Sequence, residues 1–264
     1  MTIESTKQQQ GIQSIEVGAQ LLRALAANGR SMKLGDIAKK AEMPAAKAHR
    51  YLVSFIRMGL VEQDVNTGRY DLGEFALEIG LASLSRIDAV RLADPILEDL
   101  CEEVGETVAL SVWGNTGATC VRVIDAGGTV TVALRTGVVM PLTTSATGLA
   151  YVAFYQSPYL KKLLDVELNA TAAAKKTSLS SVRDDLEALL KEIRAHRIAR
   201  ASGSLTPGIN GFSAPVFDHT GRMVAAITSL GTVGHFEMGW DSPLAQSIRD
   251  SAAKLSNRLG YVQL

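Results

Sequence analysis

The sequence is poor in the side chains that bind metals and carry redox chemistry. Its 264 residues include only two cysteines, Cys101 and Cys120, which do not form a Cys-x-x-Cys pair, and four histidines, none of which is spaced to complete a zinc site. Zinc sites need three or four such ligands from the protein. The sequence therefore predicts no metal and no cofactor, and it predicts two reduced, buried cysteines in a cytoplasmic protein.

Signals for secretion and membrane insertion are also missing. The amino-terminal segment MTIESTKQQQ is polar and lacks the apolar stretch of a signal peptide. The longest run without a charged residue, 136–160, is long enough to span a bilayer, but Pro141, Pro158 and a cluster of Thr and Ser interrupt it. We expect this run to be a buried segment with a turn, in a protein without a membrane partner.

Catalytic motifs are absent as well. A nucleophile can be imagined in Ser145 or Ser202, with His196, His219 or His235 as the base, but neither serine lies in a Gly-x-Ser-x-Gly motif. The segment GNTGAT lacks the lysine of a phosphate-binding loop, and no Gly-x-Gly-x-x-Gly opens a helix after a strand. The sequence predicts a protein that is not an enzyme and has no catalytic residues.

A net charge is lacking too, because 27 Lys and Arg balance 27 Asp and Glu. Since Lys and Arg bind nucleic acids through the phosphates, neutrality alone argues against such a partner. The charge is unevenly distributed, however: residues 11–72 carry a net charge of +3 and residues 73–264 a net charge of −3. Within the first part, residues 33–57 include six basic and two acidic side chains. The basic part is therefore a candidate for binding DNA.

The first part of the chain shows three short helical patterns followed by a hairpin pattern. Apolar residues recur at helical spacing in the segments 14–28, 33–41 and 44–58. The following LVEQDVNTGRYDLG alternates apolar and polar residues on either side of a turn that contains Gly68. Three helices and a two-stranded wing predict a winged helix-turn-helix domain over residues 11–72.

The rest of the chain mixes helical and β-rich segments. Residues 73–92 are predicted to form a linker helix, and a further helix is expected from Asp94-Pro95 to Gly105. The β-rich runs TVALSVWG, TCVRVIDA and TVTVALRTG predict an antiparallel meander. Later helices are expected near 145–156, 179–195 and 243–259, and strands near 212–218 and 223–230. The order predicts an α+β domain over residues 93–264, with one antiparallel sheet flanked by helices.

The second helix of a helix-turn-helix contacts base edges with its amino-terminal residues. Here these residues are Ala45, Ala46, Lys47, His49 and Arg50. Alanine methyl groups can contact thymine methyl groups, and Lys or Arg can pair with guanine. Lys33 and Arg69 suit phosphate groups. Alternatively, the basic residues form an ordinary solvated surface; the turn, the wing and the local charge together favour double-stranded DNA as a partner.

The segment LGDIAKKAEMPAAKAHRYLVSFIRMGLVEQDVNTGRYDLG resembles the amino-terminal domain of the IclR family of bacterial transcriptional regulators. The later segments LRTGVVMPLTTSATGLAYVAF and PGINGFSAPVFDHTGRMVAAITSLG are similar to the family's Gly-x-x-x-Pro-Leu loop with its helix and to its last two strands. The resemblance covers residues 11–260 in the same order. It implies a GAF-like carboxy-terminal domain that binds a small metabolite, and a homodimer or dimer of dimers on a palindromic operator.

The loop 141–148, PLTTSATG, leads into a helix and is the best candidate for a ligand site. A helix start has free backbone N–H groups and a dipole that favours an anion, so a carboxylate would fit. The residues alone leave open that Ser145 or Thr144 simply caps the helix. The resemblance places the ligand between this loop and the last two strands. The candidate effector-binding residues are Met140, Ser145, Ala146, Thr147, Gly211, Thr228 and Leu230, although Met140, like Trp113, can also be an ordinary core residue.

Several positions depart from the common pattern of the family. Thr143 stands where the family often has His, and Leu149 where it often has Lys. Gly211 and Leu230 replace the polar side chains of members that sense small oxoacids, and ARASGSL lacks the carboxylate of an often acidic stretch. We therefore expect an effector with a bulky apolar body, an aromatic or otherwise hydrophobic carboxylic acid. The alternative is a winged-helix regulator whose carboxy-terminal domain only mediates protein contacts. Whether the effector releases or recruits the protein stays open.

Overall fold

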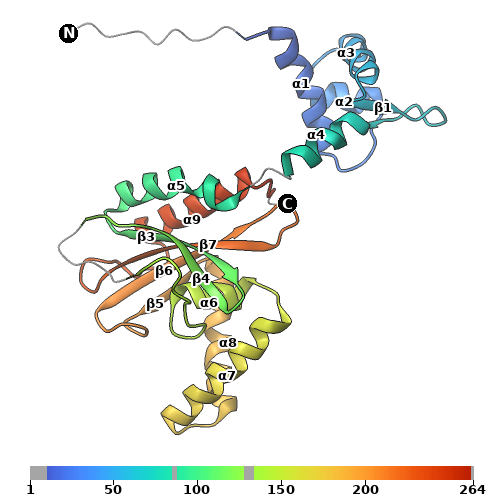
Figure 1. Cartoon of the computed structure of the whole chain (residues 1–264). Coiled ribbons are helices and arrows are strands. Elements are labelled where there is room, and N and C mark those ends of the chain that lie inside the picture. Colours follow the sequence, from blue (N-terminus) through green and yellow to red (C-terminus); the bar gives the residue numbers. More distant parts are fainter. Residues whose placement is uncertain (1–10, 85–87, 128–133, 263–264) are drawn as a thin grey trace, which may run out of the picture. The chain divides into compact units, whose positions relative to one another are not determined.

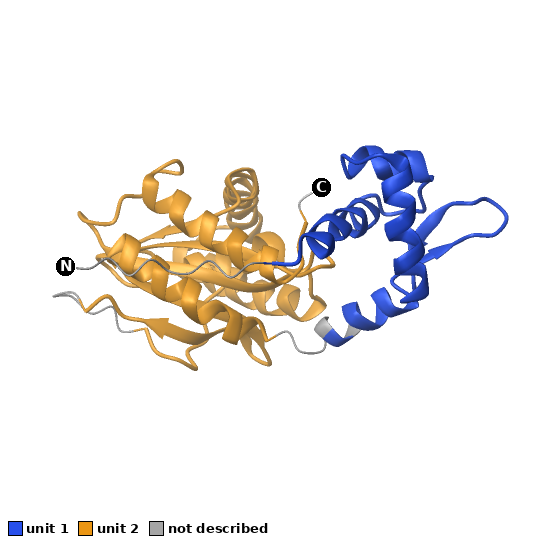
Figure 2. Ribbon diagram, turned by 90° about the horizontal axis from the view of Figure 1, so that it is seen from above, with its two compact units in different colours: residues 1–87 blue, residues 88–264 orange. Residues whose placement is uncertain are grey.

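The computed structural model of the chain describes residues 11–84, 88–127 and 134–262. The chain divides into two compact units, residues 1–87 and residues 88–264 (Figure 2). Among the described residues, no helix combines the length and the apolar content that crossing a bilayer requires. The expected α+β class, with a helix-turn-helix followed by an antiparallel sheet, is confirmed.

The first unit consists of short helices and a hairpin: α1 (Gln13–Ala26), α2 (Leu34–Lys40), α3 (Ala45–Arg57), β1 (Val61–Gln63), β2 (Tyr70–Leu72) and α4 (Glu74–Leu84). Helices α1, α2 and α3 enclose an apolar core in which Leu21, Ile37 and Leu52 are fully buried. The backbones of Met32 and Tyr70 exchange hydrogen bonds of 2.9 and 2.8 Å, which attach the wing to the segment before α2. The wing and the helices therefore form one packed body.

Local sequence signals explain the boundaries in this unit. Helix α3 begins directly after Pro44, whose fixed φ suits a helix start. Gly59, with φ +73°, ends the helical segment, and Gly68, with φ +65°, closes the wing turn. A side chain at Gly73 would overlap the carbonyl oxygen of Gly59, so glycine also permits the close approach of the wing to the end of α3. The three helices and the hairpin predicted for the winged domain are all present.

The second unit is built on a five-stranded antiparallel sheet in the order β4-β3-β7-β6-β5 (Figure 1). Its elements are α5 (Ala89–Val104), β3 (Thr107–Gly114), β4 (Gly117–Ile124), α6 (Ala146–Phe154), α7 (Pro158–Lys175), α8 (Leu179–His196), β5 (Ala199–Ser202), β6 (Ile209–Phe217), β7 (Met223–Thr232) and α9 (Pro243–Arg258). Helices α5 and α9 cover one face of the sheet, α6 packs on the other, and α7 and α8 pair with each other beyond α6.

Helix α6 is fixed to the sheet by an aromatic side chain. The ring of Tyr151 lies 5.4 Å from that of Trp113, and its hydroxyl donates a hydrogen bond of 2.9 Å to the carbonyl oxygen of Ser111 on β3. Burial raises the pKa of the Tyr151 hydroxyl, which therefore stays a neutral donor. The start of α6, where the candidate loop ends, is thereby held against the centre of the sheet.

The linker region differs from the prediction. The helix expected over 73–92 is interrupted at Asp88, which is extended, and the helix expected to start at Asp94-Pro95 starts at Ala89 with Pro95 in its interior. The carboxylate of Asp88 caps α5 by accepting hydrogen bonds from the N–H groups of residues 90 and 91 (3.0 and 3.3 Å). This cap and the buried face of α5 outweigh the hydrogen bond that proline cannot donate. The second unit thus begins at residue 88, ahead of the expected 93.

The sheet also differs from a simple meander. Most of the third predicted strand, 129–137, lies outside the described residues. The segment that follows runs beside β4, where the N–H of Cys120 donates to Val138 O (2.9 Å) and the N–H of Met140 to Ala118 O (2.7 Å). On its other side β3 pairs with β7, the last strand of the chain that the structure describes. Long-range pairing of this kind has no local sequence signal.

Two elements, α7 and β5, have no counterpart among the predicted ones. Helix α7 does carry a start signal, because the Ser157 hydroxyl accepts a hydrogen bond from the N–H of Tyr159 and Pro158 occupies the first turn. Strand β5 has only four residues and forms the edge of the sheet next to β6. Its formation depends on that neighbour, so the sequence of the segment alone does not reveal it.

Gly148 provides a test of how the loop and α6 pack. A Cβ atom at this position would overlap the backbone of Pro141 and Leu142, which has little room to move. We expect Gly148→Ala to lower the free energy of unfolding of the second unit by about 3 kcal/mol. Both tryptophans, Trp113 and Trp240, belong to this unit, so urea unfolding followed by tryptophan fluorescence measures its stability.

The matched control is Gly35→Ala in α2, where an added Cβ has no atom within 4 Å. Its fluorescence transition should equal that of the wild type, and its first unit should gain up to about 1 kcal/mol from reduced freedom of the unfolded chain. An unchanged fluorescence midpoint for Gly148→Ala would contradict the packing described above.

Candidate nucleic-acid interface and ligand cavity

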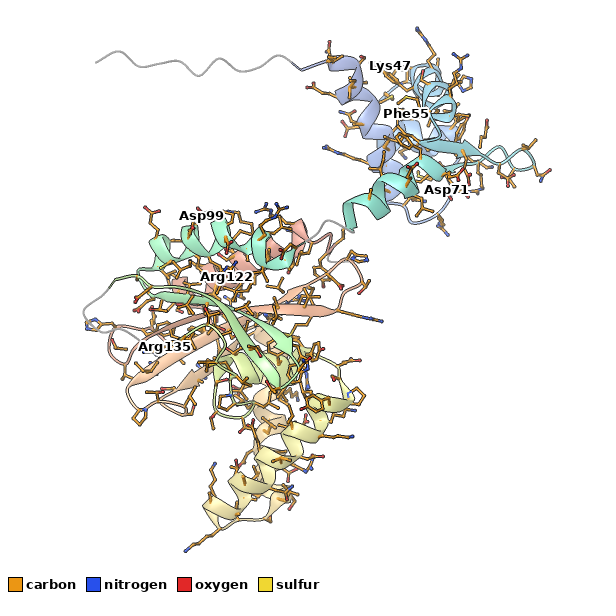
Figure 3. The ribbon with its side chains drawn as sticks, viewed as in Figure 1. Lys47, Phe55, Asp71, Asp99, Arg122 and Arg135 are labelled. Atoms are coloured by element: carbon orange, nitrogen blue, oxygen red, sulfur yellow. The ribbon has the colours of Figure 1, made fainter. Side chains whose placement is uncertain are left out.

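Helix α3 turns one face inward and presents the predicted DNA-binding residues on the other. Ala48 and Leu52 are fully buried in the core of the unit. The five predicted residues of this helix are exposed: Ala45, Ala46, Lys47, His49 and Arg50. Figure 3 labels Lys47 on this helix. Because α3 follows α2 through a turn of a few residues, its exposed first turns can enter a major groove.

The two predicted phosphate-binding residues have different surroundings. Lys33 is exposed at the residue that precedes α2. Arg69 is half-buried, and its guanidinium donates a hydrogen bond of 3.0 Å to the carbonyl oxygen of Ser31. One guanidinium N–H therefore joins the wing to the segment before α2. The remaining N–H groups have no partner in the described part of the chain and can contact a phosphate.

The wing ends in a turn that its own side chains hold. The carboxylate of Asp64 accepts hydrogen bonds from the N–H groups of Asn66 (2.9 Å) and Thr67 (2.7 Å). Hydrogen bonds from Thr67 hold the pKa of this carboxyl below its usual range, so the turn keeps its anchor at neutral pH. Val65 at the tip is 97% exposed. The wing is thus a defined projection rather than a loose loop.

A wide, polar hollow of about 930 Å³ lies beside α2 in the same unit. The basic side chains that line it are Arg30, Lys39, Lys40 and Arg69, against the acidic Asp36 and Glu42. Arg30, Lys39 and Lys40 were not among the predicted DNA contacts, because a surface cluster from separate segments appears only after folding. The excess of positive charge suits a phosphate backbone and does not suit an apolar ligand.

A second hollow, of about 470 Å³, lies in the second unit between the start of α6, the strands β6 and β7, and the β5–β6 loop. Its described lining is mostly apolar and contains no charged side chain: Leu134, Val138, Met140, Thr144, Ser145, Ala146, Thr147, Ala201, Ser204, Leu205, Thr206, Pro207, Ile209, Asn210, Gly211 and Leu230. The structure thus brings together six of the seven predicted effector-binding residues: Met140, Ser145, Ala146, Thr147, Gly211 and Leu230.

Thr228 is the predicted residue that does not line this cavity. Its hydroxyl lies 2.8 Å from that of Thr147 and donates to the hydroxyl of Ser213 at 2.9 Å. All three residues are buried, with exposures of 1%, 1% and 0%. Thr228 therefore supports the cavity wall from behind through Thr147. The family resemblance implied a direct contact of Thr228 with the ligand, but in this chain α6 covers that part of the strand.

The start of α6 combines capping with free N–H groups. The Ser145 hydroxyl accepts a hydrogen bond from the N–H of Gly148 (2.9 Å) and donates one to Pro141 O (2.7 Å). Ser145 therefore caps the helix, as expected if this loop has a structural role. The N–H groups of Ala146 and Thr147 have no acceptor in the described part of the chain. Capping by the side chain therefore leaves two backbone donors at the cavity.

The floor of the cavity is made by a cross-strand pair of β6 and β7. Gly211 lies opposite Leu230, and a Cβ atom on Gly211 would come within 2.5 Å of Leu230 Cδ2. The leucine side chain thus lies over the glycine. The extra volume expected at Gly211 is partly filled by Leu230, and the combined result is an apolar surface.

The loop between β5 and β6 was missed as a cavity wall. Its residues 204–207 line the hollow, and the Ser204 hydroxyl donates a hydrogen bond of 2.8 Å to Thr144 O. Gly203 and Gly208, with φ +62° and +82°, flank these residues. Two glycines around a short uncharged segment are a turn signal, but they do not indicate what the turn covers.

The serine and histidine residues considered as a nucleophile and base do not come together. The Ser145 hydroxyl serves as the helix cap, and the Ser202 hydroxyl donates to Asn210 Oδ1 (2.8 Å). The imidazole of His196 stacks on Trp240 with ring centres 4.7 Å apart. In the described residues neither serine is hydrogen-bonded to a histidine, so the arrangement needed for nucleophilic catalysis is not formed there.

Comparisons with known proteins agree with the two-unit organisation. Residues 14–65 match the family model described as the IclR helix-turn-helix domain, and residues 81–257 match the model described as bacterial transcriptional regulator IclR C-terminal. The crystal structure of Pseudomonas aeruginosa HmgR is similar, with a TM-score of 0.87 and 37% identity, over 96% of this chain and 100% of that chain.

Curated relatives match along most of the chain. The glycerol operon regulatory protein of Streptomyces coelicolor is 30% identical over 251 residues, 94% of this chain and 97% of its own length. The transcriptional repressor IclR of Escherichia coli is 27% identical over 225 residues, 84% of this chain and 81% of its own length. Regulators rather than enzymes share these domains. Because both family domains match in chain order and together span most of its length, this chain belongs to the IclR family of bacterial transcriptional regulators.

Proposed function

We propose that this regulator binds a palindromic operator as a dimer or dimer of dimers and changes its DNA affinity when a small organic acid occupies the 470 Å³ cavity. The observation that carries the proposal is the composition of that cavity. Apolar side chains surround two unpaired backbone N–H groups at a helix start, and no charged side chain is present in its described lining. A ligand with one carboxylate and an apolar body complements this arrangement.

The carboxylate of such a ligand would accept hydrogen bonds from the N–H groups of Ala146 and Thr147. The positive end of the α6 dipole adds about 0.3–1 kcal/mol of attraction for an anion, and more where water is excluded. The apolar body would contact Val138, Met140 and Leu230. Burying about 100 Å² of apolar surface contributes about 2.5 kcal/mol. Because a small oxoacid would make the same carboxylate contacts but little apolar contact, the apolar contribution favours an aromatic or hydrophobic acid.

The ligand class is testable by thermal unfolding. Aromatic acids such as benzoate and phenylacetate should raise the midpoint of the second unit by roughly 5–10 °C when a binder is present at about 100 times its Kd. Glyoxylate and pyruvate should raise it less. Stabilisation by the small oxoacids alone would contradict the apolar-body proposal, and no effect of any acid on melting or on operator binding would favour a domain that mediates protein contacts.

Cavity variants give this experiment its control. Gly211→Val should push the Leu230 side chain into the cavity and abolish the stabilisation by an aromatic acid. Adding Leu230→Ala to Gly211→Val removes the displaced side chain. The double variant should therefore again be stabilised by an aromatic acid. A full response in Gly211→Val would place the ligand elsewhere.

We propose that Arg50 reads a base edge from the exposed face of α3. Replacing Arg50 with Ala should then cost about 1–3 kcal/mol of discrimination between an operator obtained by in vitro selection and random DNA. Fluorescence anisotropy at fixed salt measures both affinities. Arg57→Ala, at the other end of the same helix, is the matched control and should preserve the discrimination. An equal loss on both DNAs in Arg50→Ala would reduce Arg50 to a phosphate contact.

We also propose that α4 contributes to self-association. This helix is apolar on several sides, and Phe75, Leu77 and Ile79 are 40%, 62% and 48% exposed. Helices that are apolar all round are normally covered by protein. A second copy would cover these side chains and would align two α3 helices with the half-sites of a palindrome.

The self-association proposal predicts the behaviour of two neighbouring variants. Leu77→Glu should weaken the dimer by about tenfold or more, because a carboxylate would be buried in an apolar contact. Glu78→Gln, one position along the same helix, should leave the dimer unchanged. Sedimentation at several protein concentrations distinguishes them. Equal association of Leu77→Glu and wild type would remove α4 from the interface.

A further inference from the structure

A side chain from α7 holds the loop that leads to the ligand cavity. The two carboxylate oxygens of Glu167 accept hydrogen bonds from the N–H of Leu142 (2.9 Å), from the N–H of Thr143 (3.0 Å) and from the Thr143 hydroxyl (3.0 Å). We infer that Glu167 is a positioning residue for effector binding, which keeps the free N–H groups at the start of α6 directed at the cavity. The inference rests on the proposed function of that cavity.

Glu167 contacts a loop that is distant from it in the chain. In the described part of the chain it forms no ion pair, whereas nearby Asp165 pairs with Arg183 at 2.7 Å. In the described part of the chain, the hydrogen-bond partners of its carboxylate belong to two consecutive residues of one loop. Hydrogen bonds to a charged acceptor are roughly twice as strong as neutral ones. A half-buried carboxylate used in this way restrains a backbone rather than a surface side chain.

The loop is therefore held from two sides. On the α6 side, the backbone of Pro141 and Leu142 packs directly against Gly148, where no side chain fits. On the α7 side, Glu167 binds the N–H groups of Leu142 and Thr143. Neither restraint comes from a residue that lines the cavity. Together they fix the loop before a ligand arrives, which reduces the entropy lost on binding.

The backbone N–H groups of this region divide into two sets. Those of Leu142 and Thr143 face Glu167, an acid supplied by the protein, and those of Ala146 and Thr147 have no acceptor in the described residues. The proposed ligand carboxylate would take the second set. Glu167 also explains Thr143, whose hydroxyl serves this contact and does not line the cavity.

Charge and positioning predict opposite effects of removing the carboxylate. If Glu167 acted only through its charge, its loss would strengthen the binding of an anionic ligand, because a like charge disappears. If it positions the loop, the loss weakens binding. In Glu167→Gln an amide NH₂ faces at least one of the two backbone N–H groups, so one hydrogen bond is lost. We expect Kd for the aromatic acid that stabilises the wild type most, chosen from benzoate and phenylacetate, to rise about tenfold.

The experiment compares Glu167→Gln and Glu167→Ala with Asp165→Asn, the matched control on the same helix. Calorimetric titration at a temperature well below the unfolding of each variant gives Kd. Asp165→Asn should bind as the wild type does. In Glu167→Ala, added formate should restore part of the affinity by occupying the vacated N–H groups, and in the wild type it should only compete. Unchanged or tighter binding by both Glu167 variants would overturn the inference.

Hydrogen exchange of the unliganded protein separates this inference from the proposed function. Peptides covering 141–149 should exchange about tenfold faster in Glu167→Ala than in the wild type, with α9 unaffected. Equal exchange would refute the restraint itself. If the wild type binds neither acid, the proposed function fails for these ligands and so does the ligand-binding role of Glu167, whatever the exchange shows. If the wild type binds and the variants bind equally, only the inference fails.

Discussion

The ligand cavity depends on the contact between loop 141–145 and the first turn of α6. Because Gly148 has no side chain, the loop backbone lies directly on the helix, and the Ser145 hydroxyl closes the cap between them. This geometry leaves the N–H groups of Ala146 and Thr147 without a protein acceptor in the described part of the chain, at the wall of a hollow whose described lining is mostly apolar and uncharged. The aromatic contact of Tyr151 and the carboxylate of Glu167 matter because they keep this one junction in place.

Local signals made the winged domain predictable and the linker only partly so. The boundaries of these elements are marked by Pro44, Gly59 and Gly68. Proline fixes φ at a value that suits a helix start, and glycine adopts the positive φ of these turns without strain. At the linker two signals conflict. Pro95 indicates a helix start, whereas Asp88 caps one seven residues earlier. The packing of α5 against α9 favours the earlier start. This contact joins helices that are far apart in the chain, so no local sequence pattern predicts it.

The site was predicted partly from a local signal and partly from the family resemblance, which supplied Gly211 and Leu230. The start of α6 carries its own signal, so Ser145, Ala146 and Thr147 were found from the sequence. Thr228 was assigned to the cavity through the family resemblance, which does not reveal that α6 covers this position in the present chain. Glu167 gave no signal at all, since a glutamate in the middle of an amphipathic helix normally points to water. Its role becomes visible only through its hydrogen bonds to Leu142 and Thr143, which lie 25 and 24 residues earlier in the chain.

The covalent route from the proposed ligand to DNA within one chain runs through α5, the first element after the link between the units. Gly211 and Leu230 face the cavity, and their neighbours Phe212 and Ser229 face the opposite side of the sheet, since side chains alternate along a strand. Strand β7 pairs with β3, on which α5 packs. A ligand that displaces Leu230 therefore acts on the strand next to the support of α5. Close packing transmits such a shift instead of absorbing it, so a small movement in the cavity can reach α5.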